Sequence, residues 1–244
     1  MKQLCLVLSF FILLSFSIRA QTKEDVIRKV WEGAGGKKSW QESRFLTFVF
    51  APQINGKTLI RRVHLWDRQT GDYRFETKTS KKSLLVLFNL NSQKGKSFIN
   101  GKALSDSLNT IEIKKAYKYF LADSYWLLAP LKLEDPGRQV SLEGSEDIEG
   151  TPFDVLYVTT EKDSHGPGGQ YWFYVNPVNG RIRRCKILKE GKKDSEIYDW
   201  TKYKDLGGGL KLSTHKQNIN QNKAITFPVA SVLVSVEKEK FTKK

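Results

Sequence analysis

The sequence predicts a mainly β fold, in which one long antiparallel sheet curves and helices cover its concave face. Strand-like segments, about eleven in number, follow one another at hairpin distance between residues 44 and 239. Two helical segments accompany them, one near residue 25 and one over residues 113–137. A helix inserted between strands usually packs on their sheet and buries its apolar face there. A closed barrel and a sandwich with an additional helix are the alternatives.

The segment 113–137 carries an apolar stripe at helical spacing, which another element must cover. A capping-box pattern at Asn109 and Glu112 predicts where this helix starts, and Pro130 predicts where it ends. Asp123 or Ser124 could begin a second short helix. The residues of the stripe are Ile113, Ala116, Tyr117, Phe120, Leu121, Ser124, Leu127 and Leu128.

The first helix is predicted from a second capping pattern, at Thr22 and Asp25. The glycines at 33, 35 and 36 end it, and a brief turn around Trp40 leads into the first strand. The apolar face of this helix should lie against the sheet. Its residues are Val26, Ile27, Val30, Trp31 and Ala34.

The strands are predicted from alternation of apolar and polar residues and from turn residues between them. Asn55-Gly56 is a strong signal for a hairpin turn, because both positions of a type I′ turn need positive φ. The expected strands cover residues 44–54, 57–67, 72–78, 83–91, 96–99, 138–148, 152–162, 170–175, 180–189, 194–203, 210–218 and 229–239.

The sequence predicts which faces of two of these strands are buried. In residues 72–78, Tyr73, Phe75 and Thr77 alternate with charged residues, so one face should be covered and the other should face water. Residues 83–91 include the run Leu84-Leu85-Val86-Leu87-Phe88, which has no polar face. Both sides of that strand should therefore be shielded.

Residues 1–20 have the three parts of a secretory signal peptide. Lys2 precedes an apolar run, from Leu4 to Ile18, that is short for a membrane span, and Ala20 is a small residue at the cleavage position. We expect cleavage after Ala20 and export to the periplasm; an uncleaved anchor is the alternative. Residues 21–244 contain no linker or internal repeat, so we expect a single domain that acts as a monomer.

The net charge restricts the class of partner. It is +15 at pH 7, and loss of Lys2 and Arg19 with the leader leaves +13. Nucleic acid is not expected as a partner, because an exported protein rarely meets it and the lysine pairs are scattered along the chain. Transient contact with an anionic membrane surface explains the charge better, with a merely solvated basic surface as the alternative. Cys185 alone survives cleavage, so no internal disulfide is possible.

The sequence shows no arrangement that indicates an enzyme, a metal site or a cofactor. His64, His165 and His215 have no partner at metal-ligand spacing. Asp163-Ser164-His165 contains the residue types of a catalytic triad, but adjacent residues cannot hydrogen-bond one another in the required order. We interpret that segment as the polar tip of a hairpin.

Large apolar side chains are more abundant than a thin sheet requires. Residues 171–174, Tyr-Trp-Phe-Tyr, place rings on both faces of one strand, and Trp126 adds another on the helical segment. The surplus predicts a hydrophobic cavity beneath the helices, with a dry core as the alternative. The side chains predicted to line that cavity and contact an apolar ligand are Phe48, Phe50, Phe75, Trp126, Leu127, Leu128, Pro130 and Trp172.

The segment 125–137, read YWLLAPLKLEDPG, resembles a Tyr-Trp-Leu-Leu-x-Pro-x-Lys-Leu-x-Asp-Pro-Gly element of exported LolA-related proteins. The resemblance spans nearly the whole mature chain. It implies an incomplete antiparallel β-barrel of about eleven strands, with a helical lid over an apolar cavity that receives acyl chains. LolA itself carries lipoproteins across the periplasm, and a strand arginine helps to hold the cargo. Arg61 and Arg62 lie in a comparable strand here.

The function we expect is that of a periplasmic, non-enzymatic carrier or binder of a lipid or a lipidated protein. This chain is longer than the LolA carrier and its strands diverge, so the resemblance does not assign lipoprotein as cargo. The alternative is an envelope sensor or protein-interaction module on the same scaffold with a collapsed cavity. A hydrolase is a third, weaker alternative.

Overall fold

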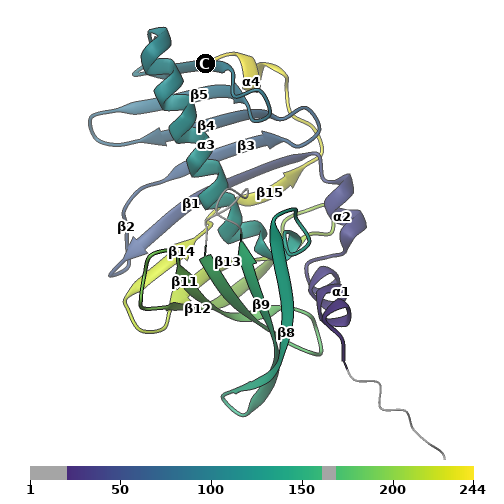
Figure 1. The fold of residues 1–244 in the computed structure, drawn as a ribbon. Coiled ribbons are helices and arrows are strands. Elements are labelled where there is room, and N and C mark those ends of the chain that lie inside the picture. The colour runs from purple at the N-terminus through teal and green to yellow at the C-terminus, as the bar shows by residue number, and fades with distance from the viewer. Residues whose placement is uncertain (1–20, 161–168) are drawn as a thin grey trace, which may run out of the picture.

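A computed structural model describes residues 21–160 and 169–244 of the chain. The predictions for the leader, for cleavage after Ala20 and for the tip at residues 163–165 lie outside the described residues. One antiparallel sheet dominates the structure (Figure 1). Its strands are β1 Phe45–Ile54, β2 Lys57–Thr58, β3 Arg62–Asp67, β4 Asp72–Lys78, β5 Ser83–Asn89, β6 Gly95–Ile99, β7 Lys102–Ala103, β8 Arg138–Ile148, β9 Thr151–Thr160, β10 Gly169–Val175, β11 Ile182–Lys189, β12 Glu196–Asp205, β13 Lys211–Asn218, β14 Lys223–Thr226 and β15 Ala230–Leu233.

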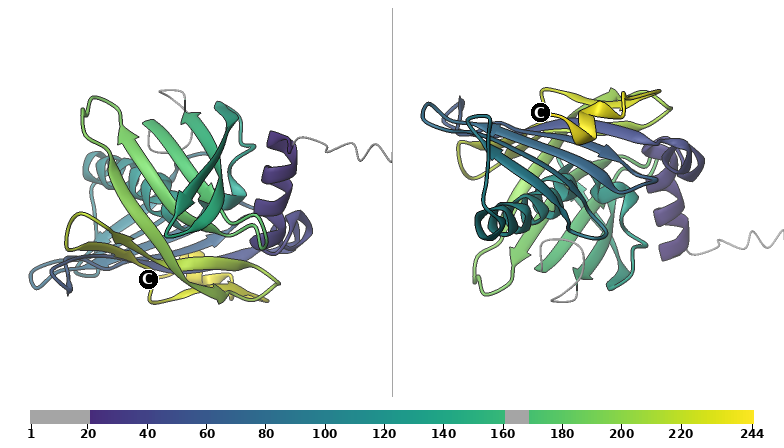
Figure 2. Two further views of the ribbon diagram at one scale, coloured as in Figure 1. Left: turned by 90° about the horizontal axis from the view of Figure 1, so that it is seen from below. Right: turned by 90° about the horizontal axis from the view of Figure 1, so that it is seen from above.

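The strand β1 joins the two halves of this sheet. The strands follow the order β7-β6-β5-β4-β3-β1-β14-β13-β12-β11-β10-β9-β8, with β2 and β15 pairing with β1 outside this path. Phe48 of β1 lies opposite His64 of β3 on one side and Ala230 of β15 on the other. Among the described strands the path ends at β7 and β8 without closing, so the sheet is an open, strongly curved one whose halves face each other (Figure 2).

The helices are few, and the long one lies on the concave side of the sheet between its two halves (Figures 1 and 2). They are α1 Lys23–Gly33, α2 Lys37–Glu42, α3 Asp106–Leu128, the 3-10 turn η1 Ala129–Leu131 and α4 Glu239–Thr242. The predicted mainly β fold with a helix across the sheet is confirmed. The described chain has 15 strands, so the predicted number of about eleven was too low.

The long helix α3 differs from its prediction at the start and in the middle. It begins at Asp106, and the Asn109 side chain donates a hydrogen bond to the Gly95 carbonyl at 3.0 Å, so the predicted capping box is wrong. Asp123 and Ser124 do not begin a second helix, because both are buried within a continuous one. The predicted end is confirmed, since the α-helix stops at Leu128 and Pro130 lies in η1.

The N-terminal helix α1 forms as predicted. Thr22 Oγ1 accepts a hydrogen bond from the Asp25 amide at 3.2 Å, and the Thr22 amide donates to Asp25 Oδ2 at 3.3 Å. Together these two bonds form the capping box. The predicted apolar face is buried against the rest of the protein. The turn expected around Trp40 is instead the short helix α2.

Several strand boundaries also differ from the predictions. The second strand is interrupted at residues 59–61, which divides it into β2 and β3, and β14 was not predicted at all. The segment 229–239 forms only the short strand β15, and α4 follows it. That helix packs against the outer face of β4 and β5, so the face of residues 72–78 that was predicted to face water is partly covered, and Arg74 donates to the Lys240 carbonyl there. Leu87 of β5 is buried there, so the prediction that both sides of this strand are covered is confirmed.

The buried apolar side chains form two large clusters. The first, here called the main core, lies between α1, η1, the end of α3 and the second half of the sheet. The second core lies between the earlier part of α3 and the strands β4 and β5. Trp66 of β3 packs against both clusters and therefore marks the place where they meet. The second core consists of Tyr73, Phe75, Leu84, Val86, Phe88, Leu90, Ile113, Ala116 and Phe120.

Candidate functional site

The side chains predicted to line a cavity are mostly inside the protein, but they do not form one group. Phe48, Phe50, Leu127 and Leu128 lie in the main core, whereas Phe75 lies in the second core. Pro130 is buried in η1, and Trp126 is partly buried with its ring 5.0 Å from that of Tyr198. The residues predicted to line the cavity are Phe48, Phe50, Phe75, Trp126, Leu127, Leu128, Pro130 and Trp172.

Trp172 is the member of this set that the structure places elsewhere. Tyr171 and Phe173 point into the main core, so Trp172, which lies between them on β10, must point to the opposite face of the sheet. There its ring lies 5.0 Å from that of Tyr157, and its Nε1 donates to Glu143 Oε2 at 3.1 Å. The predicted contact between Trp172 and a ligand beneath the helices is therefore wrong.

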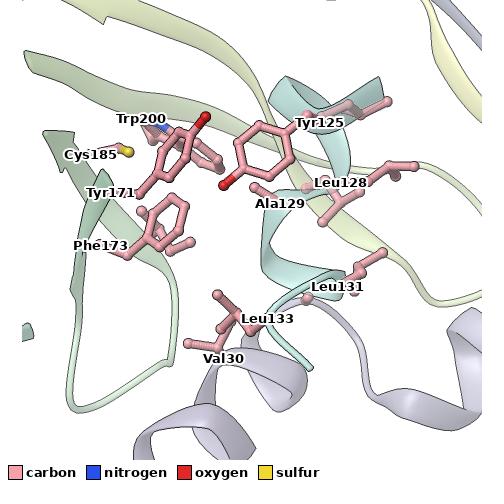
Figure 3. Close-up of a cluster of buried hydrophobic side chains, with 14 of the residues drawn as sticks. Val30, Tyr125, Leu128, Ala129, Leu131, Leu133, Tyr171, Phe173, Cys185 and Trp200 are labelled. Atoms are coloured by element: carbon pink, nitrogen blue, oxygen red, sulfur yellow. The ribbon is translucent and has the colours of Figure 1, made fainter. Parts of the chain in front are cut away.

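Side chains fill the interior around the remaining predicted residues. The Phe227 ring lies 6.1 Å from Phe48 and 5.8 Å from Phe50, and Leu127 and Leu128 are fully buried. Figure 3 shows how side chains from α1, η1, β10 and the end of α3 meet in this cluster. This packing corresponds to the alternative of a dry core. Direct contact of these residues with a lipid stays a prediction.

An open pocket lies beside this interior, where the two cores meet. It has a volume of about 670 Å³, within the range of sites that bind small ligands. We call it the mouth pocket. Its lining includes apolar side chains from β3, α3 and the turn after β5, here called the apolar wall, and three basic side chains, here called the basic wall. The two meet where the Arg68 guanidinium lies 5.7 Å from the centre of the Trp66 ring. The lining side chains used below are Trp66, Leu90, Tyr117, Phe120, Leu121, Arg68, Lys132 and Arg138.

The apolar wall of the mouth pocket is continuous with the buried cores. The Trp66 and Phe120 rings meet edge to face with centroids 5.0 Å apart, and Phe120 lies 5.1 Å from the buried ring of Tyr73. Tyr117 and Leu121 are only partly buried, although they belong to the apolar stripe of α3. An apolar ligand in the mouth pocket would therefore cover apolar surface that is now exposed to water.

The basic wall contains three cations and one nearby acid, Asp135. Arg68 lies with its guanidinium 3.3 Å from the centre of the Trp40 ring and donates to the carbonyls of Trp40 and Ser43. Burial lowers the pKa of Arg68 to about 10. Lys132 donates to Asp135 at 3.3 Å, and burial also lowers the pKa of Lys132. Arg138 lies 4.9 Å from the centre of the Tyr125 ring.

A buried polar network holds the middle of α3 on β3. Arg62 Nε and Nη2 each donate to an oxygen of Asp123 at 2.6 Å. His64 Nε2 lies 3.1 Å from Asp123 Oδ2, and its Nδ1 contacts the Tyr73 hydroxyl. Burial lowers the pKa of His64, which favours the neutral ring. Of the two arginines that the resemblance pointed to, Arg62 therefore lies beneath α3, whereas Arg61 is exposed.

Lys216 is another buried charged residue that the sequence did not reveal. Its Nζ lies 4.7 Å from the centre of the Trp200 ring and 4.8 Å from that of Phe227, and it donates to the Ser213 carbonyl. No acid among the described residues forms an ion pair with it. Burial lowers the pKa of Lys216 far below its usual value. A lysine in this position opposes folding near neutral pH.

We expect Lys216→Met to raise the free energy of unfolding by about 1 kcal/mol or more, because an apolar chain of similar length replaces a buried amine. Urea denaturation near neutral pH measures the change. The matched control is Lys186→Met, because Lys186 Nζ also lies over a tryptophan, 4.0 Å from the Trp172 ring, but on the outer face. That control should change stability by less than about 0.5 kcal/mol. A destabilised Lys216→Met would show that the bond to Ser213 outweighs the burial of the amine.

Residues 21–160 and 169–244 contain no group of three or more His, Cys, Asp or Glu side chains arranged to hold a metal ion. Within the same residues, no helix is both long enough and apolar enough to cross a membrane.

Comparison with solved structures identifies proteins of similar architecture, although no family model and no curated protein matches the sequence. A DUF1329 family protein from Desulfovibrio piger has a TM-score of 0.51 and 11% identity, over 90% of this chain and 97% of that one. A putative outer membrane lipoprotein-sorting protein domain from Vibrio parahaemolyticus has a TM-score of 0.51 and 12% identity, over 90% and 97% of the two chains. The chain shares the fold of these proteins. A LolA superfamily protein from Nitrosomonas europaea also matches, with a TM-score of 0.45 and 12% identity over 92% and 99%.

The open antiparallel sheet with a helix across it that the resemblance at 125–137 implied is thus confirmed, with more strands than expected. Within this fold, the motif supplies η1 and the residues Lys132 and Asp135, and the latter two line the mouth pocket. Sequence reasoning recognised the motif but gave its lysine no role. Trp66 and Arg68 carried no local signal, because their position at the pocket depends on the pairing of β3 in the sheet.

Proposed function

We propose that this chain is a non-enzymatic binder or carrier of a lipid or lipidated molecule, and that the ligand enters through the mouth pocket. The observation that carries the proposal is a pocket of about 670 Å³ with an aromatic wall, located where two apolar cores meet beneath α3. An acyl chain in the pocket would contact Trp66, Phe120 and Leu121 first. Movement of α3 away from the sheet would then extend the apolar surface that it can reach.

The energetics of such binding are favourable. Each methylene removed from water contributes about 0.8 kcal/mol, so about ten methylenes would contribute roughly 8 kcal/mol before ordering costs. If no ordering costs opposed it, that free energy would correspond to a dissociation constant of about 1 μM, which is the upper limit of affinity from burial alone. The aromatic wall needs no rearrangement to make the first contacts, because Trp66 and Phe120 already hold each other in an edge-to-face pair.

The fold gives the proposal independent support. One neighbour of similar fold is described as a lipoprotein-sorting protein domain, and an acyl chain is the part of a lipoprotein that a hydrophobic pocket recognises. At 12% identity this comparison supports the architecture and assigns no cargo to this chain. We therefore propose the ligand class as lipid or lipidated protein.

Export to the periplasm is part of the same proposal. The leader pattern in residues 1–20 supports it, and cleavage after Ala20 would release a chain that begins just before the cap residue of α1. The high positive charge would favour transient contact with an anionic membrane surface, from which a monomer could collect its ligand.

A second candidate function is an envelope interaction module on the same scaffold. The observation that favours it is the filled main core, in which Leu127 and Leu128 are fully buried. A groove of about 650 Å³ between α1 and β8, lined in part by Ile27 and Trp31, would be the surface available to a protein partner. In that case the mouth pocket would bind no acyl chain.

Leu121→Gln tests the proposed function. Leu121 lines the mouth pocket and is partly exposed, so a polar side chain there should weaken binding of a fluorescent fatty acyl probe roughly tenfold while the melting temperature changes little. The matched control is Leu108→Gln, on the same helix but 51% exposed and outside the pocket. This control should leave probe affinity unchanged.

Two results would contradict the proposal. The first is a wild-type protein that binds no acyl probe at micromolar concentration, which would favour the interaction module. The second is an equal loss of affinity in Leu121→Gln and Leu108→Gln, which would place the binding site elsewhere. Mass spectrometry of the protein purified without detergent adds a direct observation, since a co-purifying acyl lipid supports a carrier.

A further inference from the structure

The mouth pocket has an excess of positive over negative side chains. Arg68, Lys132 and Arg138 all line it, and Asp135 is the acid among its lining residues. Asp135 is engaged with Lys132 at 3.3 Å. The two arginines therefore face the pocket without a carboxylate of their own in the described part of the chain.

Each of these two arginines also has a buried donor that is not satisfied. Arg68 Nε and Arg138 Nη1 are inaccessible to solvent and make no hydrogen bond of good geometry with the described residues, although the Tyr125 hydroxyl is close enough to interact with Arg138. A buried donor without a well-placed partner destabilises a protein, so an acceptor that reached either guanidinium would be stabilised there. Arg68 Nη1 donates to the carbonyls of Trp40 and Ser43, which fixes the guanidinium in place.

The three cations also act on one another. Arg138 and Arg68 both lower the pKa of Lys132 by charge repulsion, in addition to the larger effect of burial. Like charges held this close in a partly desolvated pocket would be stabilised by an anion between them. Aromatic side chains line the same pocket, and the Arg68 guanidinium lies 5.7 Å from the centre of the Trp66 ring, so the complementary ligand carries a negative group next to an apolar chain.

We propose that the mouth pocket binds the anionic headgroup of an amphiphile, a carboxylate or a phosphate, through Arg138 and Arg68 with Lys132 alongside. The apolar chain of the ligand then lies against Trp66, Phe120 and Leu121. This inference rests on the proposed function and adds the chemical class of the headgroup. Arg68 serves mainly as a fixed donor, because it also ties α2 to the end of β3. Arg138 lies at the start of β8 and is the residue to vary.

The experiment compares cis-parinaric acid with its methyl ester, which has the same chain and no charge. We expect the wild-type protein to bind the acid roughly tenfold more tightly than the ester at low ionic strength, as a charge-assisted hydrogen bond implies. In Arg138→Gln this preference should fall toward one. The matched control is Arg181→Gln, since Arg181 also stacks on a tyrosine, 5.0 Å from the Tyr203 ring, but away from the pocket. This control should keep the preference.

The outcomes distinguish the proposed recognition of an anionic headgroup from the proposed lipid-binding function on which it rests. Equal affinities for acid and ester in the wild-type protein would overturn the anionic headgroup and leave the lipid binder intact, and this comparison needs no variant. Failure of the wild-type protein to bind either probe would overturn both. Inorganic phosphate alone, tested by thermal shift, distinguishes a free anion from a headgroup. Stabilisation by phosphate without binding of parinaric acid would mean that the pocket takes a free anion and not a lipid.

Discussion

Phe75→Asp is expected to lower the free energy of unfolding by at least about 4 kcal/mol, because it places a charge without a partner inside an apolar core. Phe75 is 0% exposed. Its ring lies 5.3 Å from that of His64 and 5.6 Å from that of Tyr119, so no water can reach an introduced carboxylate without disrupting the contact between α3 and β4. Urea or thermal denaturation followed by circular dichroism measures the loss.

The control lies three residues away on the same strand. Lys78 is exposed at the end of β4, so Lys78→Asp introduces the same side chain into water and should change stability by less than about 0.5 kcal/mol. The comparison therefore separates burial from any general intolerance of aspartate in β4. Comparable destabilisation by the two variants would contradict the observed register of this strand.

The success at β4 shows which part of the fold local sequence can determine. Its bounds, 72–78, agree with the prediction because alternation of apolar and charged residues allows one register only. The turn at Asn55-Gly56 was also predictable, since both residues adopt positive φ as a type I′ turn requires. In both places the residues that decide the structure are neighbours in sequence.

The strands that the sequence did not predict correctly depend on pairing with strands that are distant in sequence. The short strand β14 exists because it lies between β1 and β13, with Ala51 opposite Thr226, and its own four residues carry little pattern. Residues 229–239 have strand-like composition throughout, yet only β15 finds a partner in β1. The rest of that segment continues to α4, which covers the outer face of β4 and β5.

The candidate site was predictable only in part. An apolar stripe on α3 indicated that this helix lies over the sheet, and the structure confirms that it does. The apolar stripe could not show which of its side chains remain accessible to a ligand. Leu127 is fully buried and Leu121 lines the mouth pocket, because different parts of the protein pack against these two leucines. The basic wall was hidden for a different reason: Arg68 and Arg138 are far apart in sequence and meet at one pocket only after the sheet has curved.

Asp123 is the clearest case of a residue whose role depends on a distant partner. The sequence suggested a helix start at this position, since aspartate is a common N-cap. In the structure it lies within α3, 1% exposed at its side chain, and accepts both hydrogen bonds of the Arg62 guanidinium. Its carboxylate also contacts His64, so one acid connects α3 to two residues of β3.

Asp123→Ala is accordingly expected to lower the free energy of unfolding by about 3 to 5 kcal/mol, because it leaves the Arg62 charge largely buried without its partner. Urea denaturation measures the loss, and hydrogen exchange should show weaker protection in α3 than elsewhere. The Arg62 side chain is 14% exposed, so little water can replace the lost carboxylate. A loss below about 1 kcal/mol would mean that the pair behaves like an exposed surface ion pair.

The double variant Arg62→Met, Asp123→Leu separates two explanations of that loss. If the single variant is unstable because a charge is left unpaired, removing both charges should recover most of the lost stability, since apolar side chains of similar volume often replace a buried ion pair without loss. If the ion pair itself positions α3, the double variant should stay as unstable as Asp123→Ala. We expect recovery of at least half of the loss, because Phe50 and Tyr119, whose ring centres lie 4.6 and 4.5 Å from the Arg62 guanidinium, already provide an apolar environment for a methionine.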